Sequence, residues 1–165
     1  MSRERLEEVA AELLRRQPEA YIDLTVPEEM EGEHEDPVDP VSAALSWCKC
    51  GMCTDMPTDV ENKCCTRREG ECITNSQAFR DICLSGHILG INMRIREDEY
   101  AMEENRTNKN YRHYAYRNFI YWKYGRLGKG TRIVIPSCCV NRIRRRFPSP
   151  DGHYTGFVPG ENLQD

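Results

Sequence analysis

The chain has 165 residues, a formal net charge of −4 and a mean hydropathy of −0.73. Its length fits one compact domain with an appendage and argues against two full domains. Because it has no apolar run of membrane-spanning length and no apolar core of a signal peptide near its N-terminus, we expect a soluble, cytoplasmic protein.

An amphipathic helix is the first predicted element, within an N-terminal region of residues 1–26. Ser2 can cap this helix, Pro18 ends it, and its apolar residues recur at the spacing of one helix face: Leu6, Val9, Ala10, Leu13 and Leu14. Residues 27–46 are acidic, contain prolines and have little to bury, so we interpret them as a linker.

A cysteine-rich segment opens the predicted folded domain of residues 47–158, which is followed by a tail of residues 159–165. Nine cysteines, an odd number, in a chain without a signal peptide favour bound metal over disulfides as the staple of the fold. Gly51 permits the sharp turn that metal binding by closely spaced thiols requires. Six cysteines have the short spacing with which a backbone wraps a metal ion: Cys48, Cys50, Cys53, Cys64, Cys65 and Cys72.

The number of cysteines exceeds the needs of one ion. The pair Cys138 and Cys139 lies at the predicted start of a helix and could close the cluster, whereas Cys83 fits a small buried apolar residue. One zinc takes four thiolates, so two ions that share a sulfur fit the count, although the spacing leaves iron–sulfur open. A site made only of thiolates has no open coordination position, so the metal would stabilise the fold, and we predict no catalytic residues.

Two helical patterns follow the cysteine-rich segment. Thr74 and Gln77 have the spacing of a capping box and predict a helix over residues 75–84, which Gly86 should break. A second helical pattern extends over residues 88–102.

The last elements are two helices separated by a strand. Asn108 is the predicted cap of a third helix, which Gly125 stops. Residues 133–135 predict a short strand, and Ser137 precedes a last helix over residues 138–147. The expected fold class is α+β: a small, irregular, zinc-stapled domain, mostly helical with a few short strands.

The charge pattern suggests an anionic partner. Residues 105–150 contain twelve Lys and Arg side chains and no Asp or Glu. Helical spacing places Arg112 and Tyr116 on one face of the third helix, with His113 and Arg117 beside them, where they could bind a phosphate and stack a base. A solvated cationic face would produce the same pattern, and nucleic-acid binding stays open.

Several motifs occur together in the order and spacing of a known family: WCKCGMC at 47–53, CC at 64–65, CIT at 72–74, YRHYAYR at 111–117, PSCC at 136–139 and GHYTGF at 152–157. On these motifs the chain resembles the cytoplasmic C-terminal ballast domain of P2X purinoceptor 7, which also occurs in stand-alone P2X purinoceptor 7-like proteins. The resemblance covers about residues 47–157. It implies a dinuclear zinc centre with these ligands: Cys48, Cys50, Cys53, Cys64, Cys65, Cys72 and Cys138.

The same resemblance implies a guanine nucleotide, GDP or GTP, as ligand. Arg112 and His113 would bind its phosphates, and the base would lie among Tyr116, Ile133 and Ile135. Val140 stands where the family has an arginine, and Ser149 where it has another basic residue. Phosphate affinity would be weaker or lost unless Arg142 or Arg145 compensates for these two changes.

These observations favour a zinc-stabilised guanine-nucleotide-binding regulatory module that is neither a channel nor an enzyme. One alternative is a protein-interaction adaptor with a structural dinuclear zinc core and no nucleotide, in which the N-terminal helix docks a partner. Another is nucleic-acid binding through residues 105–150. A nucleotide hydrolase is disfavoured because that basic segment offers no carboxylate to hold magnesium.

Overall fold

The computed structural model describes residues 2–16, 45–68, 70–100 and 106–160. Their secondary structure consists of α1 (Arg3–Arg16), η2 (Asp59–Glu61), η3 (Ile73–Asn75), α3 (Gln77–Phe79), η4 (Arg80–Leu84), α4 (Gly86–Tyr100), α5 (Asn108–Tyr124) and α6 (Ser137–Arg146). The predicted linker of residues 27–46 lies outside the described residues except for its last two positions. None of the described helices is long and apolar enough to cross a bilayer.

The expected α+β class is wrong, because the described part of the chain is helical and contains no strand. Residues 133–135 form no strand, because no neighbouring segment of the described chain pairs with them. Instead, the Lys63 ammonium donates to the Val134 carbonyl at 3.2 Å, and the Ser137 N–H donates to the Lys63 carbonyl at 2.8 Å. A short β-branched run has strand propensity, but without a partner strand its backbone groups are satisfied in other ways.

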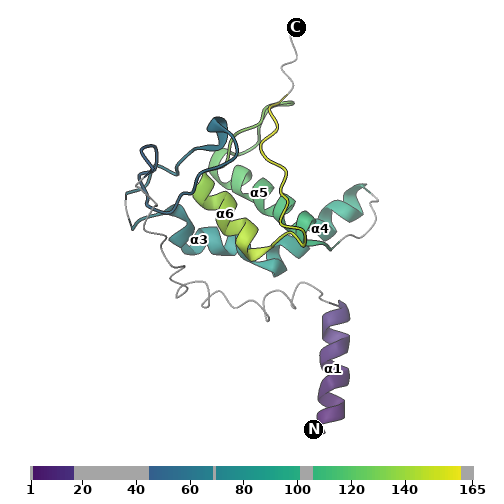
Figure 1. Cartoon of the computed structure of the whole chain (residues 1–165). Helices are drawn as coiled ribbons and strands as arrows, with labels where there is room; N and C mark the ends of the chain where they lie inside the picture. Colours follow the sequence, from purple (N-terminus) through teal and green to yellow (C-terminus); the bar gives the residue numbers. More distant parts are fainter. Residues whose placement is uncertain (1, 17–44, 69, 101–105, 161–165) are drawn as a thin grey trace.

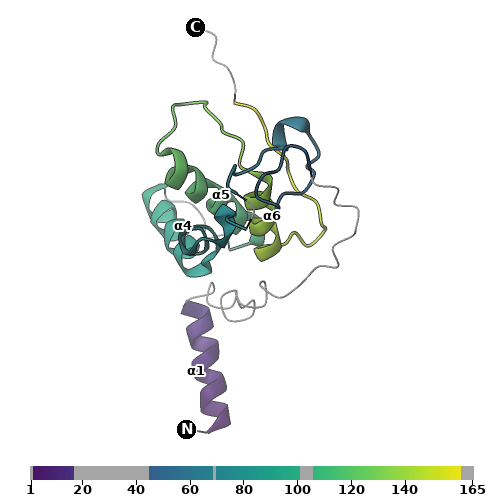
Figure 2. The ribbon, with the colours of Figure 1, turned by 90° about the vertical axis from the view of Figure 1, so that its left-hand side faces the viewer.

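Helix α1 confirms the predicted N-terminal helix. The Ser2 hydroxyl accepts from the Arg5 N–H at 3.3 Å, and Arg3 pairs with Glu7 one turn later at 2.9 Å. In Figures 1 and 2, α1 stands apart from the other helices. Leu6 and Leu13 on its apolar face are 52% and 57% exposed, so the described residues leave this face uncovered.

The predicted helix over residues 75–84 is present as α3 followed directly by η4, and its predicted capping box is wrong. The cap is Ser76, whose hydroxyl accepts from the Phe79 N–H at 3.2 Å. Thr74 is buried, and its hydroxyl donates to the Cys72 sulfur at 3.1 Å. The π-helical turn η4 then directs Cys83 and Leu84 fully into the core.

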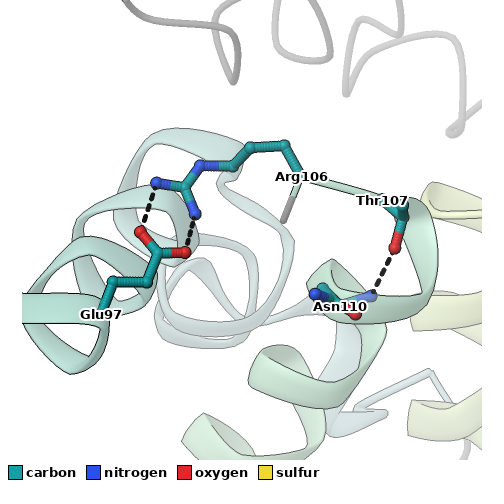
Figure 3. A network of polar contacts seen from close by, with 4 residues as sticks. All are labelled: Glu97, Arg106, Thr107 and Asn110. Atoms are coloured by element: carbon teal, nitrogen blue, oxygen red, sulfur yellow. Dashed lines mark hydrogen bonds and ion pairs between the residues drawn. The ribbon is translucent and has the colours of Figure 1, made fainter. Parts of the chain in front are cut away.

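Helix α5 is the centre of the folded domain, between α4 and α6 in both views (Figures 1 and 2). Its cap is Thr107, one residue before the predicted Asn108, and the Thr107 hydroxyl accepts from the Asn110 N–H at 3.4 Å. Gly125 ends the helix as predicted, with φ of 69°. Arg106 and Glu97 form a two-bond ion pair of 2.6 and 2.9 Å that joins α4 to the start of α5 (Figure 3).

The hydrophobic core lies between these helices. Phe119 of α5 meets the edge of Phe79 with ring centroids 6.2 Å apart, and Tyr111 stacks on Phe147 at 5.3 Å. The other large buried side chains come from η4, α4 and α6: Leu84, Leu89, Met93 and Ile143. The same core includes buried cysteines, so the thiol cluster is continuous with it.

Candidate metal centre and adjoining cavities

Seven thiols converge on one corner of the domain and form two groups of four. The sulfur atoms of Cys48, Cys50, Cys53 and Cys64 all lie within 4.8 Å of one another, and so do those of Cys50, Cys65, Cys72 and Cys138. Cys50 belongs to both groups. These are the seven cysteines that the family resemblance implied as ligands, and all nine cysteines of the chain are free thiols.

The loop geometry explains how six of these thiols come from one short segment. Gly51 has φ of 76°, a conformation that reverses the chain between Cys50 and Cys53 at little steric cost to glycine. The N–H groups of Lys49 and Thr66 both donate to the Cys64 sulfur at 3.3 Å. Backbone donors around a sulfur stabilise negative charge on it, as ligand thiolates require.

Two of the thiols have a depressed pKa. Burial opposes ionisation of Cys64, but the backbone N–H groups around it outweigh burial and lower its pKa to about 6. Hydrogen bonding from the Cys138 thiol lowers the pKa of Cys72 to about 5, against the opposing effect of burial, and Thr74 adds to this lowering. Each group of four therefore contains a thiol that ionises readily.

Helix α6 delivers the seventh thiol, Cys138, from its first turn. Ser137 fixes this turn against the cysteine loop: its hydroxyl donates to the Thr54 carbonyl at 2.6 Å and accepts from the Thr54 N–H at 3.2 Å. Sequence analysis placed Ser137 at the start of the last helix but did not predict its contact with Thr54, because a partner 83 residues away leaves no local signal.

Cys139 and Cys83 are fully buried and belong to neither group of four. The Cys139 sulfur lies 4.0 Å from that of Cys138. Burial, followed by the nearby charge of Cys139, raises the pKa of Cys83, as expected of a thiol in an apolar setting. Both act as small core residues.

Two cavities adjoin along α5. The first has a volume of about 880 Å³, lies between the start of α5 and residues 149–155, and is lined by Arg112, His113 and Tyr116. The second, of about 700 Å³, is lined by Ile133 and Ile135 and again by His113 and Tyr116. Five of the six predicted nucleotide-binding residues therefore line at least one of these two neighbouring cavities, whereas Arg142 lines neither.

Arg112 is more buried than a solvated cationic face would allow. Only 7% of it is exposed, and its guanidinium donates to the Phe147 carbonyl at 2.6 Å while lying 5.0 Å from the centroid of the Tyr154 ring. His113 lies beside it, and burial, followed by the charge of Arg96, lowers its pKa.

Much of the basic segment is engaged inside the protein. Arg106 pairs with Glu97, and the buried Arg146 donates to the Leu84 carbonyl at 3.2 Å. Arg106, Arg112 and Arg146 therefore stabilise the fold through contacts within the protein. Part of the positive charge that suggested nucleic-acid binding is used in this way.

Three residues at the cavities were missed by sequence analysis. Arg144 and Tyr154 each line one cavity and contact each other, with the guanidinium carbon 4.6 Å from the ring centroid. Glu61 is 5% exposed and accepts from the Phe157 N–H at 2.9 Å and the Thr58 hydroxyl at 2.7 Å. Arg144 was considered only as one of a cluster of arginines, and its place one helical turn after Val140, which lines the same cavity, could have singled it out.

Residues 2–158 match the family model of the P2X purinoreceptor 7 intracellular domain. The chain is 35% identical over 135 residues to P2X purinoceptor 7 of Mus musculus, which covers 79% of this chain and 23% of that protein. It is also 35% identical over 136 residues to P2X purinoceptor 7 of Rattus norvegicus, with the same coverage. The chain thus spans less than a quarter of the length of these relatives. The family match begins at residue 2 and so extends beyond the motifs of residues 47–157.

Proposed function

Because the chain belongs to the P2X purinoreceptor 7 intracellular domain family, we propose that it is a cytoplasmic regulatory module that is stabilised by two zinc ions and binds a guanine nucleotide. The observations that carry this proposal are the pair of four-thiol groups that share Cys50 and the two cavities that share His113 and Tyr116 in their linings.

The spacing of the thiols fits zinc. Four sulfurs placed about 2.3 Å from a central zinc form a tetrahedron with edges of about 3.8 Å. The sulfur of Cys50 lies 3.9 Å from that of Cys48 and 3.8 Å from that of Cys53, and Cys65 lies 3.9 Å from Cys72. Thiolates also suit zinc better than the hard cations calcium and magnesium, which prefer oxygen.

The proposed zinc ions have a structural role. Each site has four protein sulfurs and therefore no open position for water or substrate. The ligands come from the cysteine loop and from α6, so the ions connect segments that the modest hydrophobic core alone holds weakly.

The cavities support nucleotide binding through their different linings. Arg112 and His113 would bind the phosphates in the first cavity, because guanidinium and imidazole groups donate to phosphate oxygens. Ile133 and Ile135 line the second cavity and would enclose the base, with Tyr116 at the junction.

A native mass spectrum of the purified, untagged protein tests both halves of the proposal. We expect a mass increment of two zinc ions, plus a guanine nucleotide where one is retained. Calorimetric titration with GDP then measures binding directly, and Arg112→Gln should weaken it by roughly tenfold or more through loss of a charge-assisted contact. A protein without zinc contradicts the first half, and a zinc-loaded protein that does not bind GDP contradicts the second.

A second candidate function is protein interaction through α1. Its apolar face is exposed among the described residues, as shown by Leu6 and Leu13. In this case, Leu6→Ser with Leu13→Ser should abolish capture of the partner without changing zinc content or GDP affinity. Capture that survives the double substitution contradicts this function.

A further inference from the structure

Two arginines flank one tyrosine ring at the junction of the cavities. The guanidinium carbon of Arg144 lies 4.6 Å from the centroid of the Tyr154 ring, and that of Arg112 lies 5.0 Å from the same centroid. Because both groups keep their positive charge at every physiological pH, this arrangement concentrates two like charges around one neutral ring.

Neither arginine forms an ion pair with a carboxylate of the described residues, although hydrogen bonding from His153 first, and the charge of Arg112 in addition, lowers the pKa of Asp151 on the first cavity. The Asp151 carboxylate on the first cavity accepts from the Ser149 hydroxyl at 2.8 Å and the His153 N–H at 3.0 Å. Glu61 on the second cavity is likewise engaged by neutral donors. No carboxylate among the described residues forms an ion pair with Arg144.

Arg144 also retains unused hydrogen-bonding capacity. Its Nε–H is buried and has no hydrogen-bond partner within the described part of the chain. A buried donor of this kind costs free energy unless a ligand or water accepts from it. A ligand that meets both arginines must therefore offer several negatively charged acceptor oxygens.

Helix geometry explains why Arg144 lines the second cavity whereas Arg142 and Arg145 do not. Val140 and Arg144 are one turn apart on α6, and both line the second cavity. Arg142 and Arg145, which sequence analysis named as replacements for an arginine at position 140, line neither cavity. Arg144 therefore presents a positive charge to the second cavity one turn after Val140.

We propose that Arg144 is a phosphate-binding residue and that, with Arg112 across Tyr154, it forms a two-arginine clamp for the diphosphate group of the nucleotide. This inference rests on the proposed function and identifies the part of the ligand that the junction holds. Guanidinium groups suit this role because they donate two parallel bonds to phosphate oxygens.

The test measures binding of GDP, guanosine and inorganic pyrophosphate to the zinc-loaded protein and to Arg144→Gln. The substitution should weaken GDP and pyrophosphate roughly tenfold to a hundredfold, the range expected for a lost charge-assisted contact, and should leave guanosine within about twofold. The matched control is Arg145→Gln, which removes the same charge from an exposed position on the same helix and should leave all three within about twofold.

The possible outcomes separate the clamp from the proposed function. Equal GDP affinity of wild type and Arg144→Gln overturns the clamp and leaves nucleotide binding intact. The clamp is also overturned if Arg145→Gln loses as much GDP affinity as Arg144→Gln does. Wild-type protein that binds pyrophosphate but not GDP overturns the nucleotide function, while loss of pyrophosphate binding in Arg144→Gln alone supports the clamp. If the wild-type protein binds neither GDP nor pyrophosphate, both the clamp and the nucleotide-binding function are overturned.

A second variant covers the case in which Arg144→Gln does not fold, as judged by zinc content and thermal unfolding. Arg144→Lys keeps the charge but loses the planar fork, so we expect GDP to bind several-fold more weakly than to wild type. Wild-type affinity in Arg144→Lys overturns a clamp that depends on two parallel bonds.

Discussion

The sulfur atoms of Cys50 and Cys138 lie within 4.8 Å of each other, although 88 positions separate the two residues in the chain. One belongs to the loop that opens the folded domain, and the other to the first turn of α6. Contacts of such long range are costly in chain entropy, so an interaction that stabilises this one contributes strongly to the fold.

The shared position of Cys50 predicts an unequal effect of cysteine substitutions on zinc content. Cys50→Ser should release both ions, because it removes a ligand from both groups of four, and should lower the free energy of unfolding by about 4 kcal/mol or more. Atomic emission spectrometry of the purified variants measures the ions per chain. Cys83→Ala is the control, since Cys83 is buried outside both groups and its substitution should keep both ions. Two ions retained in Cys50→Ser would contradict the shared ligand.

Gly125 predicts a backbone effect at the end of α5. Its φ of 69° and ψ of −152° belong to a region that residues with a side chain rarely occupy. A methyl group at this position would meet no atom within 4 Å, so Gly125→Ala should destabilise the domain through backbone strain alone, by about 1–3 kcal/mol. Urea unfolding measures this change. Gly128→Ala, where φ is ordinary and the nearest contact is 3.5 Å, should change stability far less; equal effects would refute the strain argument.

The ion pair of Glu97 and Arg106 predicts a measurable coupling energy. The two side chains are 16% and 11% exposed, so solvent screens them weakly. A double-mutant cycle with Glu97→Gln and Arg106→Gln should give about 1–3 kcal/mol. The Arg3–Glu7 pair of α1, with side chains 92% and 65% exposed, should give no more than about 0.5 kcal/mol. Similar coupling in both pairs would show that burial does not decide their strength.

His113 predicts a pH dependence of nucleotide binding. Burial and then Arg96 lower its pKa from 6.5, so its imidazole is neutral at pH 7. Acidification below this lowered pKa adds a positive charge at the first cavity, beside Arg112 and Lys109 and opposed by Asp151. GDP should therefore bind more tightly once the pH falls below this lowered pKa than at pH 7.5, as measured by calorimetry across the acidic range. The same trend in His113→Gln would assign the effect to another group.

Local sequence patterns were sufficient for the larger helices but not for the short elements. The apolar stripe of α1, the stop at Gly125 and the start of α6 near Ser137 are local signals, and each is confirmed within one or two residues. The strand over residues 133–135 failed because pairing depends on a second segment that the local sequence does not reveal. The Thr74 cap failed because the hydroxyl bonds to the Cys72 sulfur instead.

The candidate site shows the same limit. Cysteine spacing and family motifs were enough to name the seven thiols that the structure brings together. The replacement for an arginine at position 140 was assigned to Arg142 or Arg145, whereas Arg144 lines the cavity. Which side of α6 faces the cavity depends on how the helix packs against the rest of the domain. A cluster of neighbouring arginines does not by itself show which of them lies on that side.

Helix α6 begins in the cysteine cluster at Cys138 and carries Arg144 on the cavity less than two turns later. If both proposed sites are occupied, a helix shared by them can couple their binding free energies, and such coupling is reciprocal. Bound nucleotide would then strengthen zinc binding, and the loss of zinc would weaken nucleotide binding by the same equilibrium factor. The metal centre would thus make the chain responsive to cellular zinc supply as well as to nucleotide.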